Sequence, residues 1–171
     1  MNKSNRNKAL VSISIIALIV AVIAGIYFVK TGSEKTPSED LAHPLEITTV
    51  DLDEIKGSNV PIIIDFGATE CIPCKEMAPV LVKLNDEMQG KARIHFVDVW
   101  KDPTAARGFP IQLIPTQLLI NADGTPYTPS EDMKIEFTAY SDKETGEHIY
   151  TTHEGGLSED QLRSILKDMR A

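Results

Sequence analysis

The chain has 171 residues, of which 42% are hydrophobic and 25% are charged, and this composition excludes intrinsic disorder as the default state. The formal net charge is −8, and all 25 acidic residues follow Lys30, whereas four of the 17 basic residues lie at or before it. An acidic domain of this kind is not expected to bind nucleic acid or anionic lipid surfaces.

An apolar run from Ala9 to Val29 contains neither a charge nor a proline. As a helix it would be about 31 Å long, close to the thickness of the hydrocarbon core of a bilayer. A cleavable signal peptide is the alternative, because Val22-Ile23-Ala24 has the form of a cleavage site, but the apolar run continues beyond it. We therefore expect an uncleaved, single-pass membrane anchor over residues 9–29.

The charges that flank this run indicate its orientation. Lys3, Arg6 and Lys8 precede it, whereas the basic residues that follow are diluted by acids, so residues 1–8 are expected to stay in the cytoplasm. Residues 30–44 are polar with two prolines, which is typical of a flexible linker. The remaining residues, 45–171, are then expected to fold outside the cytoplasm, on the periplasmic or cell-surface side.

The first predicted elements of the domain are a short helix in "TTVDLDEIKGS", ending near Gly57, and a strand over residues 60–66. The strand is apolar without alternation, as expected when both faces of a sheet are covered. An amphipathic helix follows the strand. Its apolar stripe consists of Met77, Val80, Leu81, Leu84 and Met88.

The middle of the domain contains a second predicted strand over residues 92–100 and a short helix or turn in "DPTAARG". A third strand is predicted over residues 116–120, closed by the turn "NADG". Since the first two strands are separated by a helix, they are expected to form a βαβ unit with parallel strands.

The last part of the chain contains two further predicted strands, over residues 135–140 and 147–153, joined by the turn "SDKETGE". A final helix is predicted to begin after Ser158, with Gln161 completing a capping box. The late hairpin makes the sheet mixed, so the predicted fold class is α/β.

The segment "DFGATECIPCK" holds both cysteines of the chain, Cys71 and Cys74. A C-x-x-C pair can be half of a zinc site, a structural disulfide or a redox couple. Only His148 and His153 could complete a zinc site, and they lie far downstream, while a disulfide closing so short a loop removes little unfolded-state entropy. The redox couple also explains the neighbouring residues, so we expect no metal and no cofactor.

The residues around the cysteines suit the start of a helix that follows a buried strand. Cys71 would lie at the helix N-terminus, where free N–H groups and the helix dipole favour a thiolate, and Pro73 suits the first turn. A carboxylate at the end of a buried strand is costly unless it is paired or protonated. We therefore expect the pKa of Asp65 to be raised and its carboxyl to take the proton of Cys74. The alternative is an acid that faces solvent at a strand end.

The apolar strand ending in Asp-Phe, the C-x-P-C pair and the lysine after it resemble the active-site segment of the thioredoxin family. The segment "IQLIPT" resembles the family's loop with a cis-proline, which would be Pro115. The resemblance, over about residues 45–171, implies a thioredoxin-like three-layer fold with a mixed β-sheet flanked by helices. It also implies a redox disulfide in which Cys71 is the attacking thiol, Cys74 the resolving thiol and Asp65 the buried acid or base.

The same resemblance implies the substrate-binding residues. Pro115 would face the cysteines, the backbone of Ile114 would pair with the bound substrate chain, and Pro73 would lie beside it.

Several positions depart from the family pattern. Glu70 and Gly67 stand where the family usually has aromatic residues, and Phe96 stands where a lysine often neighbours the buried acid. Negative charge at Glu70 opposes the thiolate that the helix start favours. About twenty extra residues between Gly124 and Glu147 enlarge the late hairpin; we expect a surface loop there, with a partner-binding lip as the alternative.

These features predict a membrane-anchored, extracytoplasmic thiol–disulfide oxidoreductase that reduces disulfides of exported proteins. The resemblance implies that its electrons come from a membrane thiol transporter of the cytochrome c biogenesis type. A disulfide-forming oxidase is the nearest alternative. The alternative from another class is a thioredoxin-fold module that binds a metal ion or a client chain without turnover.

Overall fold

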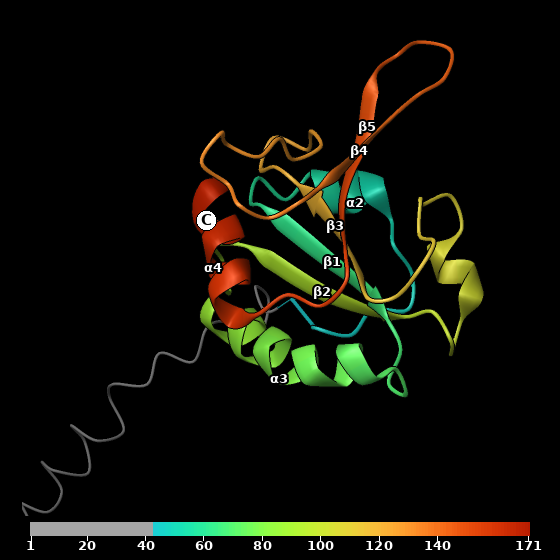
Figure 1. Cartoon of the computed structure of the whole chain (residues 1–171), viewed down its shortest axis with the longest axis vertical. Helices are drawn as coiled ribbons and strands as arrows, with labels where there is room; N and C mark the ends of the chain where they lie inside the picture. Colours follow the sequence, from blue (N-terminus) through green and yellow to red (C-terminus); the bar gives the residue numbers. More distant parts are fainter. Residues whose placement is uncertain (1–42) are drawn as a thin grey trace, which may run out of the picture. The chain divides into compact units, whose positions relative to one another are not determined.

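A computed structural model describes residues 43–171 of the chain (Figure 1). The predicted cytoplasmic segment 1–8, the anchor 9–29 and the linker up to residue 42 lie outside the described residues. Within residues 43–171, no helix combines the length and the apolar character needed to cross a membrane.

Five strands in this part of the chain form a mixed sheet with the order β2-β1-β3-β5-β4. β1 (Ile62–Gly67) pairs in parallel with β2 (Arg93–Asp98) and antiparallel with β3 (Thr116–Ile120). β5 (His148–Glu154) pairs antiparallel with both β3 and β4 (Thr138–Ser141). The predicted α/β class and mixed sheet are confirmed.

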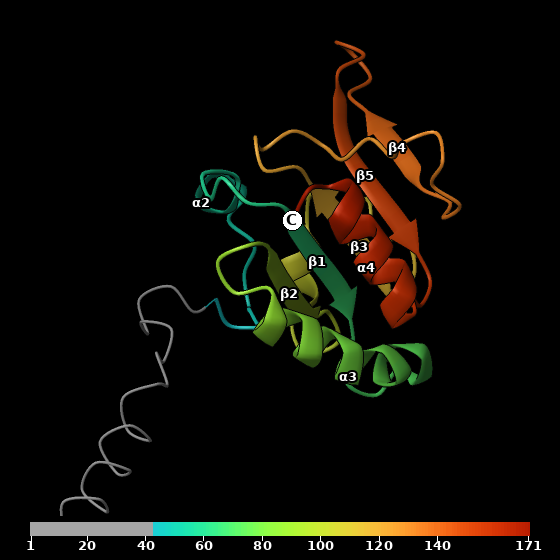
Figure 2. The same ribbon diagram turned by 90° about the vertical axis from the view of Figure 1, so that its left-hand side faces the viewer.

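Helices cover both faces of this sheet. α3 (Ile72–Glu87) and α4 (Glu159–Asp168) pack on one face, where Figure 2 shows them in front of the strands. α2 (Leu52–Lys56) and the 3₁₀ helix η2 (Pro103–Ala106) pack on the other face. Because α3 connects the parallel strands β1 and β2, the βαβ unit and the three layers agree with the expectation from the sequence.

The alternation of side chains along β1 divides the core into two parts. Ile63 packs with the residues of α3 and α4, whereas Ile62, Ile64 and Phe66 pack with the residues of α2 and η2. All four are fully buried, which explains why the strand is apolar without alternation. Since Asp65 follows Ile63 by two residues, it lies on the face covered by α3 and α4.

α4 begins with the capping box predicted from the sequence. The Ser158 hydroxyl accepts a hydrogen bond from the backbone N–H of Gln161 at 3.3 Å, and the Gln161 side chain accepts one from the backbone N–H of Ser158 at 2.9 Å. The apolar stripe of this helix is buried in the core. It consists of Leu162, Ile165, Leu166 and Met169.

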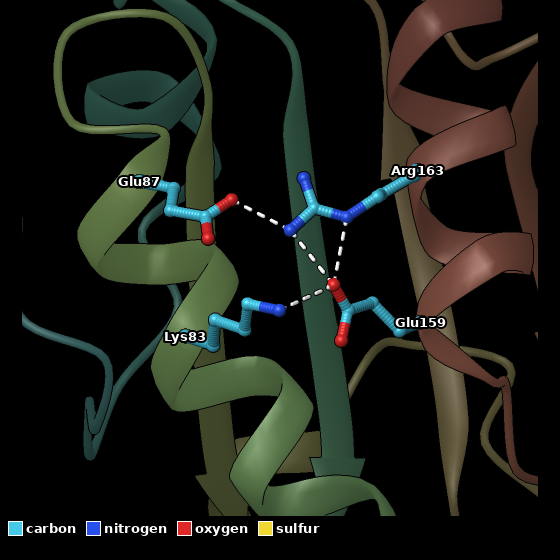
Figure 3. Close-up of polar contacts among 4 residues, drawn as sticks. All are labelled: Lys83, Glu87, Glu159 and Arg163. Carbon is cyan, nitrogen blue, oxygen red and sulfur yellow. Dashed lines mark hydrogen bonds and ion pairs between the residues drawn. The ribbon is translucent and has the colours of Figure 1, made fainter.

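Four charged side chains connect α4 to α3 at the surface (Figure 3). Arg163 Nη2 lies 2.6 Å from Glu87 Oε2 and 2.8 Å from Glu159 Oε1, and Lys83 Nζ lies 2.7 Å from the same Glu159 oxygen. Partly exposed pairs of this kind contribute about 0.2–1 kcal/mol each. The buried apolar stripe therefore holds α4 in place more strongly than the ion pairs do.

The two described residues that precede the expected domain start at residue 45 make hydrogen bonds to the domain. The backbone N–H of His43 donates to Gln89 Oε1 at 2.9 Å, and the Pro44 carbonyl oxygen lies 2.9 Å from His95 Nδ1. Residues 43–44 were expected to belong to the linker, but these hydrogen bonds attach them to α3's C-terminal end and to β2.

The extra residues before β4 form an irregular and mainly exposed segment, as expected of a surface loop, but a few of its side chains attach it to the core. Tyr127 is 1% exposed, and its hydroxyl donates to Asp168 of α4. Three further side chains pack on the same core, namely Met133, Ile135 and Phe137. β4 therefore starts at Thr138 and is shorter than predicted, while the tip of the β4–β5 hairpin projects away from the sheet (Figure 1).

Candidate active site

The two cysteines lie where β1 leads into α3. Cys71 is the N-cap of α3, Pro73 lies in the first turn, and Cys74 is one turn inside the helix, as the sequence predicted. Both are free thiols, and they are 8% and 3% exposed. Both thiols are thus partly shielded, with Cys71 slightly more accessible.

The loop before β3 closes over the cysteines. The Ile114–Pro115 peptide bond is cis, as the resemblance implied, and Ile114 packs against Cys71 and Cys74. Cys71 Sγ donates a long hydrogen bond of 3.9 Å to the Ile114 carbonyl oxygen. The structure therefore brings Ile114 and Pro115 to the cysteine pair from a distant part of the chain.

Glu70, directly before Cys71, forms an ion pair with Lys75. Glu70 Oε2 lies 3.1 Å from Lys75 Nζ, and both side chains are exposed. No side chain caps α3 by a hydrogen bond, so the free N–H groups of its first turn lie beside Cys71. The ion pair therefore weakens the opposition that Glu70 was expected to offer to a thiolate.

Asp65 is fully buried in β1, on the face covered by α3 and α4. Its Oδ1 accepts a hydrogen bond of 2.8 Å from Gln117 Nε2, whereas its Oδ2 has no hydrogen-bond partner. Burial raises the pKa of Asp65 to about 7, and the hydrogen bond from Gln117 acts in the opposite direction. The raised pKa agrees with the sequence expectation and rules out an acid that faces solvent.

Cys74 and Asp65 border the same small space next to Gly67. A Cβ atom on Gly67 would lie 3.2 Å from Cys74 Sγ and 3.3 Å from Asp65 Oδ2. It would also lie 2.8 Å from Phe96 Cε2, which is too close for a real contact. Glycine therefore fits here without displacing the Phe96 ring, which fills the place of a side chain beside the thiol and the carboxyl.

Cys74 is held in its protonated form. Burial raises its pKa to about 12, with further contributions from a hydrogen bond to Cys71 and from the nearby Asp65 carboxyl. A thiol of this kind attacks slowly unless a base takes its proton. The unpartnered oxygen of Asp65 is the nearby group that can do so.

Gln117 belongs to this site and was missed in the sequence analysis. It is fully buried in β3, directly opposite Asp65 in the antiparallel register. One signal could have identified it: a glutamine within the otherwise apolar "TQLLI" requires a buried partner. On the other side of Asp65, the parallel register places Phe96, as the resemblance implied for the position of the lysine.

The two histidines considered as zinc ligands lie in other surroundings. His148 Nε2 is 3.0 Å from the Tyr150 carbonyl oxygen, and His153 Nδ1 is 2.8 Å from the Glu136 carbonyl oxygen. Among residues 43–171, no group of three or more His, Cys, Asp and Glu side chains could hold a metal ion.

Large apolar side chains are exposed near the cysteines. Ile72, directly after Cys71, is 72% exposed, and Leu113, directly before Ile114, is 46% exposed. Trp100 is 61% exposed and follows β2, whose C-terminal end lies beside that of β1. Exposed apolar side chains beside a reactive thiol can make contacts to another protein.

The model of the Thioredoxin family matches residues 44–139. Thioredoxins of Staphylococcus aureus, among them those of strains Mu50 / ATCC 700699 and MW2, are 40% identical over 82 residues, which is 48% of this chain and 77% of theirs.

Among solved structures, a mutant thioredoxin from Halobacterium salinarum NRC-1 superposes with a TM-score of 0.53 at 22% identity. The alignment covers 77% of this chain and 94% of that one, and it shows a shared fold. Chloroplastic thioredoxin z has a TM-score of 0.49 at 20% identity, with 75% and 97% of the two chains covered.

Proposed function

The chain belongs to the thioredoxin family of redox proteins, and on that premise we propose that it reduces disulfides of exported proteins from a membrane anchor. Thioredoxins are thiol–disulfide oxidoreductases, so the proposal concerns the direction, the clients and the place of the reaction. The observation that carries it is the pair of free thiols at the start of α3, with an unpartnered carboxyl oxygen beside the buried thiol.

In the first step, the Cys71 thiolate attacks one sulfur of a client disulfide. A mixed disulfide forms between Cys71 and the client, and the other client sulfur leaves as a thiolate that takes up a proton. The position of Cys71 at the N-cap of α3 favours the thiolate form of the attacking thiol, because the positive end of the helix dipole lies there.

In the second step, Cys74 gives its proton to Asp65 and attacks the sulfur of Cys71. The bond between Cys71 and the client breaks, the second client sulfur leaves and is protonated, and a disulfide joins Cys71 to Cys74. Two electrons have then passed from the cysteine pair to the client, which is released as a dithiol.

Client binding is proposed to involve the loop that closes over the cysteines. The Ile114 backbone would pair with an extended client segment, with Pro115 and Pro73 on either side of Cys71. The exposed apolar side chains of Ile72 and Leu113 support a protein client, since they offer contacts to its side chains.

The oxidised pair must be reduced again by a donor. We propose a membrane thiol transporter of the cytochrome c biogenesis type, because the apolar run at residues 9–29 would hold the domain at the outer side of the membrane. Protease added to intact cells should then digest the C-terminal domain. Protection of the domain until the cytoplasmic side is opened would contradict this location.

The reaction itself is tested with the full-length protein in an insulin-reduction assay with dithiothreitol, together with single-cysteine variants. Cys74→Ala should accumulate covalent complexes with clients, because the second step is blocked. Cys71→Ala should capture few, because burial raises the pKa of Cys74 to about 12. Equal trapping by both variants, or no turnover of insulin, would favour a binding module without catalysis.

The direction is tested by the reduction potential of the pair. We expect a value nearer to about −270 mV, as in thioredoxin, than to about −120 mV, as in the periplasmic oxidase DsbA. A potential above about −180 mV would instead favour the disulfide-forming oxidase.

A further inference from the structure

The two oxygens of the Asp65 carboxyl have different surroundings. Oδ1 accepts the 2.8 Å hydrogen bond from Gln117 Nε2, while Oδ2 is buried without a partner. Oδ2 is also the oxygen that borders the space beside Gly67, together with Cys74 Sγ. The hydrogen bond from Gln117 therefore leaves free the oxygen that lies near the thiol.

Gln117 is the polar side chain that fixes this carboxyl in the described part of the chain. Phe96 occupies the position across β1 and offers only a ring, and no ion pair of Asp65 is present within residues 43–171. Without the amide, both carboxyl oxygens would be buried without a partner, and the carboxyl could rotate freely between them.

Gln117 is itself held in place. It is fully buried in β3, its backbone pairs with β1 opposite Asp65, and its Nε2 lies 3.9 Å from Met77 Sδ of α3. Its Oε1 has no hydrogen-bond partner. An amide carries both a donor and an acceptor, so the donor can serve an ionised carboxyl and the acceptor a protonated one. A lysine at this site would favour only the ionised form.

We propose that Gln117 is the positioning residue of the Asp65 carboxyl, which it orients so that Oδ2 takes the proton of Cys74 during release of the client. This inference rests on the proposed function, since it concerns the second step of that reaction. It assigns to a glutamine of β3 a partnership with the buried acid that a lysine often provides in the family, at the position that Phe96 occupies here.

The test uses the full-length protein and an aromatic disulfide that yields a coloured thiol. The first molecule of coloured thiol reports the attack by Cys71, and the second reports release by Cys74. Gln117→Met keeps the length of the side chain but removes its donor. We expect an unchanged first phase and a second phase slowed about tenfold at neutral pH, because a hydrogen bond to a charged group is lost.

The pH profile separates positioning from damage to the fold. In Gln117→Met the second phase should regain much of its rate at higher pH, and carboxyl NMR titration should show a raised pKa of Asp65 relative to the wild type. Thr152→Val is the matched control, because Thr152 is an equally buried polar residue of the same sheet whose hydroxyl has no partner. It should leave the pH profile unchanged.

A double variant completes the test. In an Asp65→Asn background, Gln117→Met should have no further effect on the second phase. A wild-type pH profile in Gln117→Met, or an equal slowing with and without Asp65, would overturn the inference while leaving the proposed function intact. Absence of a second phase in the wild type itself would overturn both.

Discussion

At the scale of single residues, the site depends on three residues that border one buried space. Asp65 supplies a carboxyl with a pKa near 7, Cys74 supplies a thiol with a pKa of about 12, and Gly67 leaves room between them and the Phe96 ring. A group that titrates near neutral pH can both take and return a proton under ordinary conditions. The site is therefore suited to a reversible thiol–disulfide reaction.

Replacing Asp65 by asparagine should affect only the release step. We expect Asp65→Asn to slow the second phase of coloured-thiol production by about 10² to 10⁴, the usual contribution of a positioned base, while the first phase keeps its rate. Stopped-flow measurement of both phases checks this. Release at the wild-type rate would remove Asp65 from the mechanism.

Adding a methyl group at Gly67 should disturb the same space. Because its Cβ would meet Phe96 Cε2 at 2.8 Å, Gly67→Ala should lower the free energy of unfolding by about 1–3 kcal/mol. Gly156→Ala is the control, since its Cβ would meet atoms of Pro73 only at 3.9 and 4.0 Å. Denaturant unfolding of both variants provides the measurement, and equal stability would show that the Phe96 ring moves aside without cost.

At the scale of elements, the loop before β4 is attached to the core by a few apolar side chains, chiefly Tyr127. Tyr127 packs between the sheet and α4 and donates a hydrogen bond to Asp168, while the tip of the β4–β5 hairpin carries no comparable buried group. The enlarged hairpin therefore has two parts, an anchored first segment and a projecting tip. Both the tip and the exposed residues 128–132 of the first segment are available as a surface for a partner.

This division predicts different tolerance to substitution. Tyr127→Ala should lower the free energy of unfolding by about 3–5 kcal/mol, because it removes a buried aromatic ring. Ile149→Ala, in the exposed part of β5, should cost less than about 1 kcal/mol. Urea unfolding of the two variants compares them directly. Similar small losses would mean that Tyr127 does not anchor this loop to the core.

At the scale of the whole molecule, the protonation of Asp65 makes the free energy of unfolding depend on pH. Its pKa is about 7 in the folded chain and about 3.9 in an unfolded one, so the folded state holds a proton that the unfolded state has already lost. The free energy of unfolding should therefore fall as pH rises from about 4 to about 7 and then stay level. Asp168 acts in the opposite direction and at lower pH, because its hydrogen bond from Tyr127 lowers its pKa.

Comparison with Asp65→Asn isolates this contribution. The variant should be more stable than the reduced wild type above pH 7, by up to about 4 kcal/mol, and this difference should disappear toward pH 4. Urea unfolding of both proteins across this pH range measures it. Parallel pH curves for the two proteins would show that Asp65 is not protonated in the folded state.

The sequence by itself determined the features that depend on neighbouring residues. The capping box of α4, the start of α3 at Cys71 and the βαβ unit follow from local hydrogen bonding, helix geometry and hydrophobic periodicity. Asp65 stands out as a candidate site residue because a carboxylate in a buried apolar strand is costly unless it is paired or protonated. Each of these features involves residues that are close in the sequence, so it can be predicted without a structure.

Only the tertiary structure decided which distant residues meet. Gln117 and Asp65 are 52 positions apart, and their hydrogen bond depends on the register between β1 and β3. The space beside Gly67 likewise depends on the Phe96 ring from β2, and the burial of Tyr127 depends on the place of α4. The periodicity of a segment indicates which of its faces is buried, but the packing of the whole core decides which residues of another segment lie opposite that face.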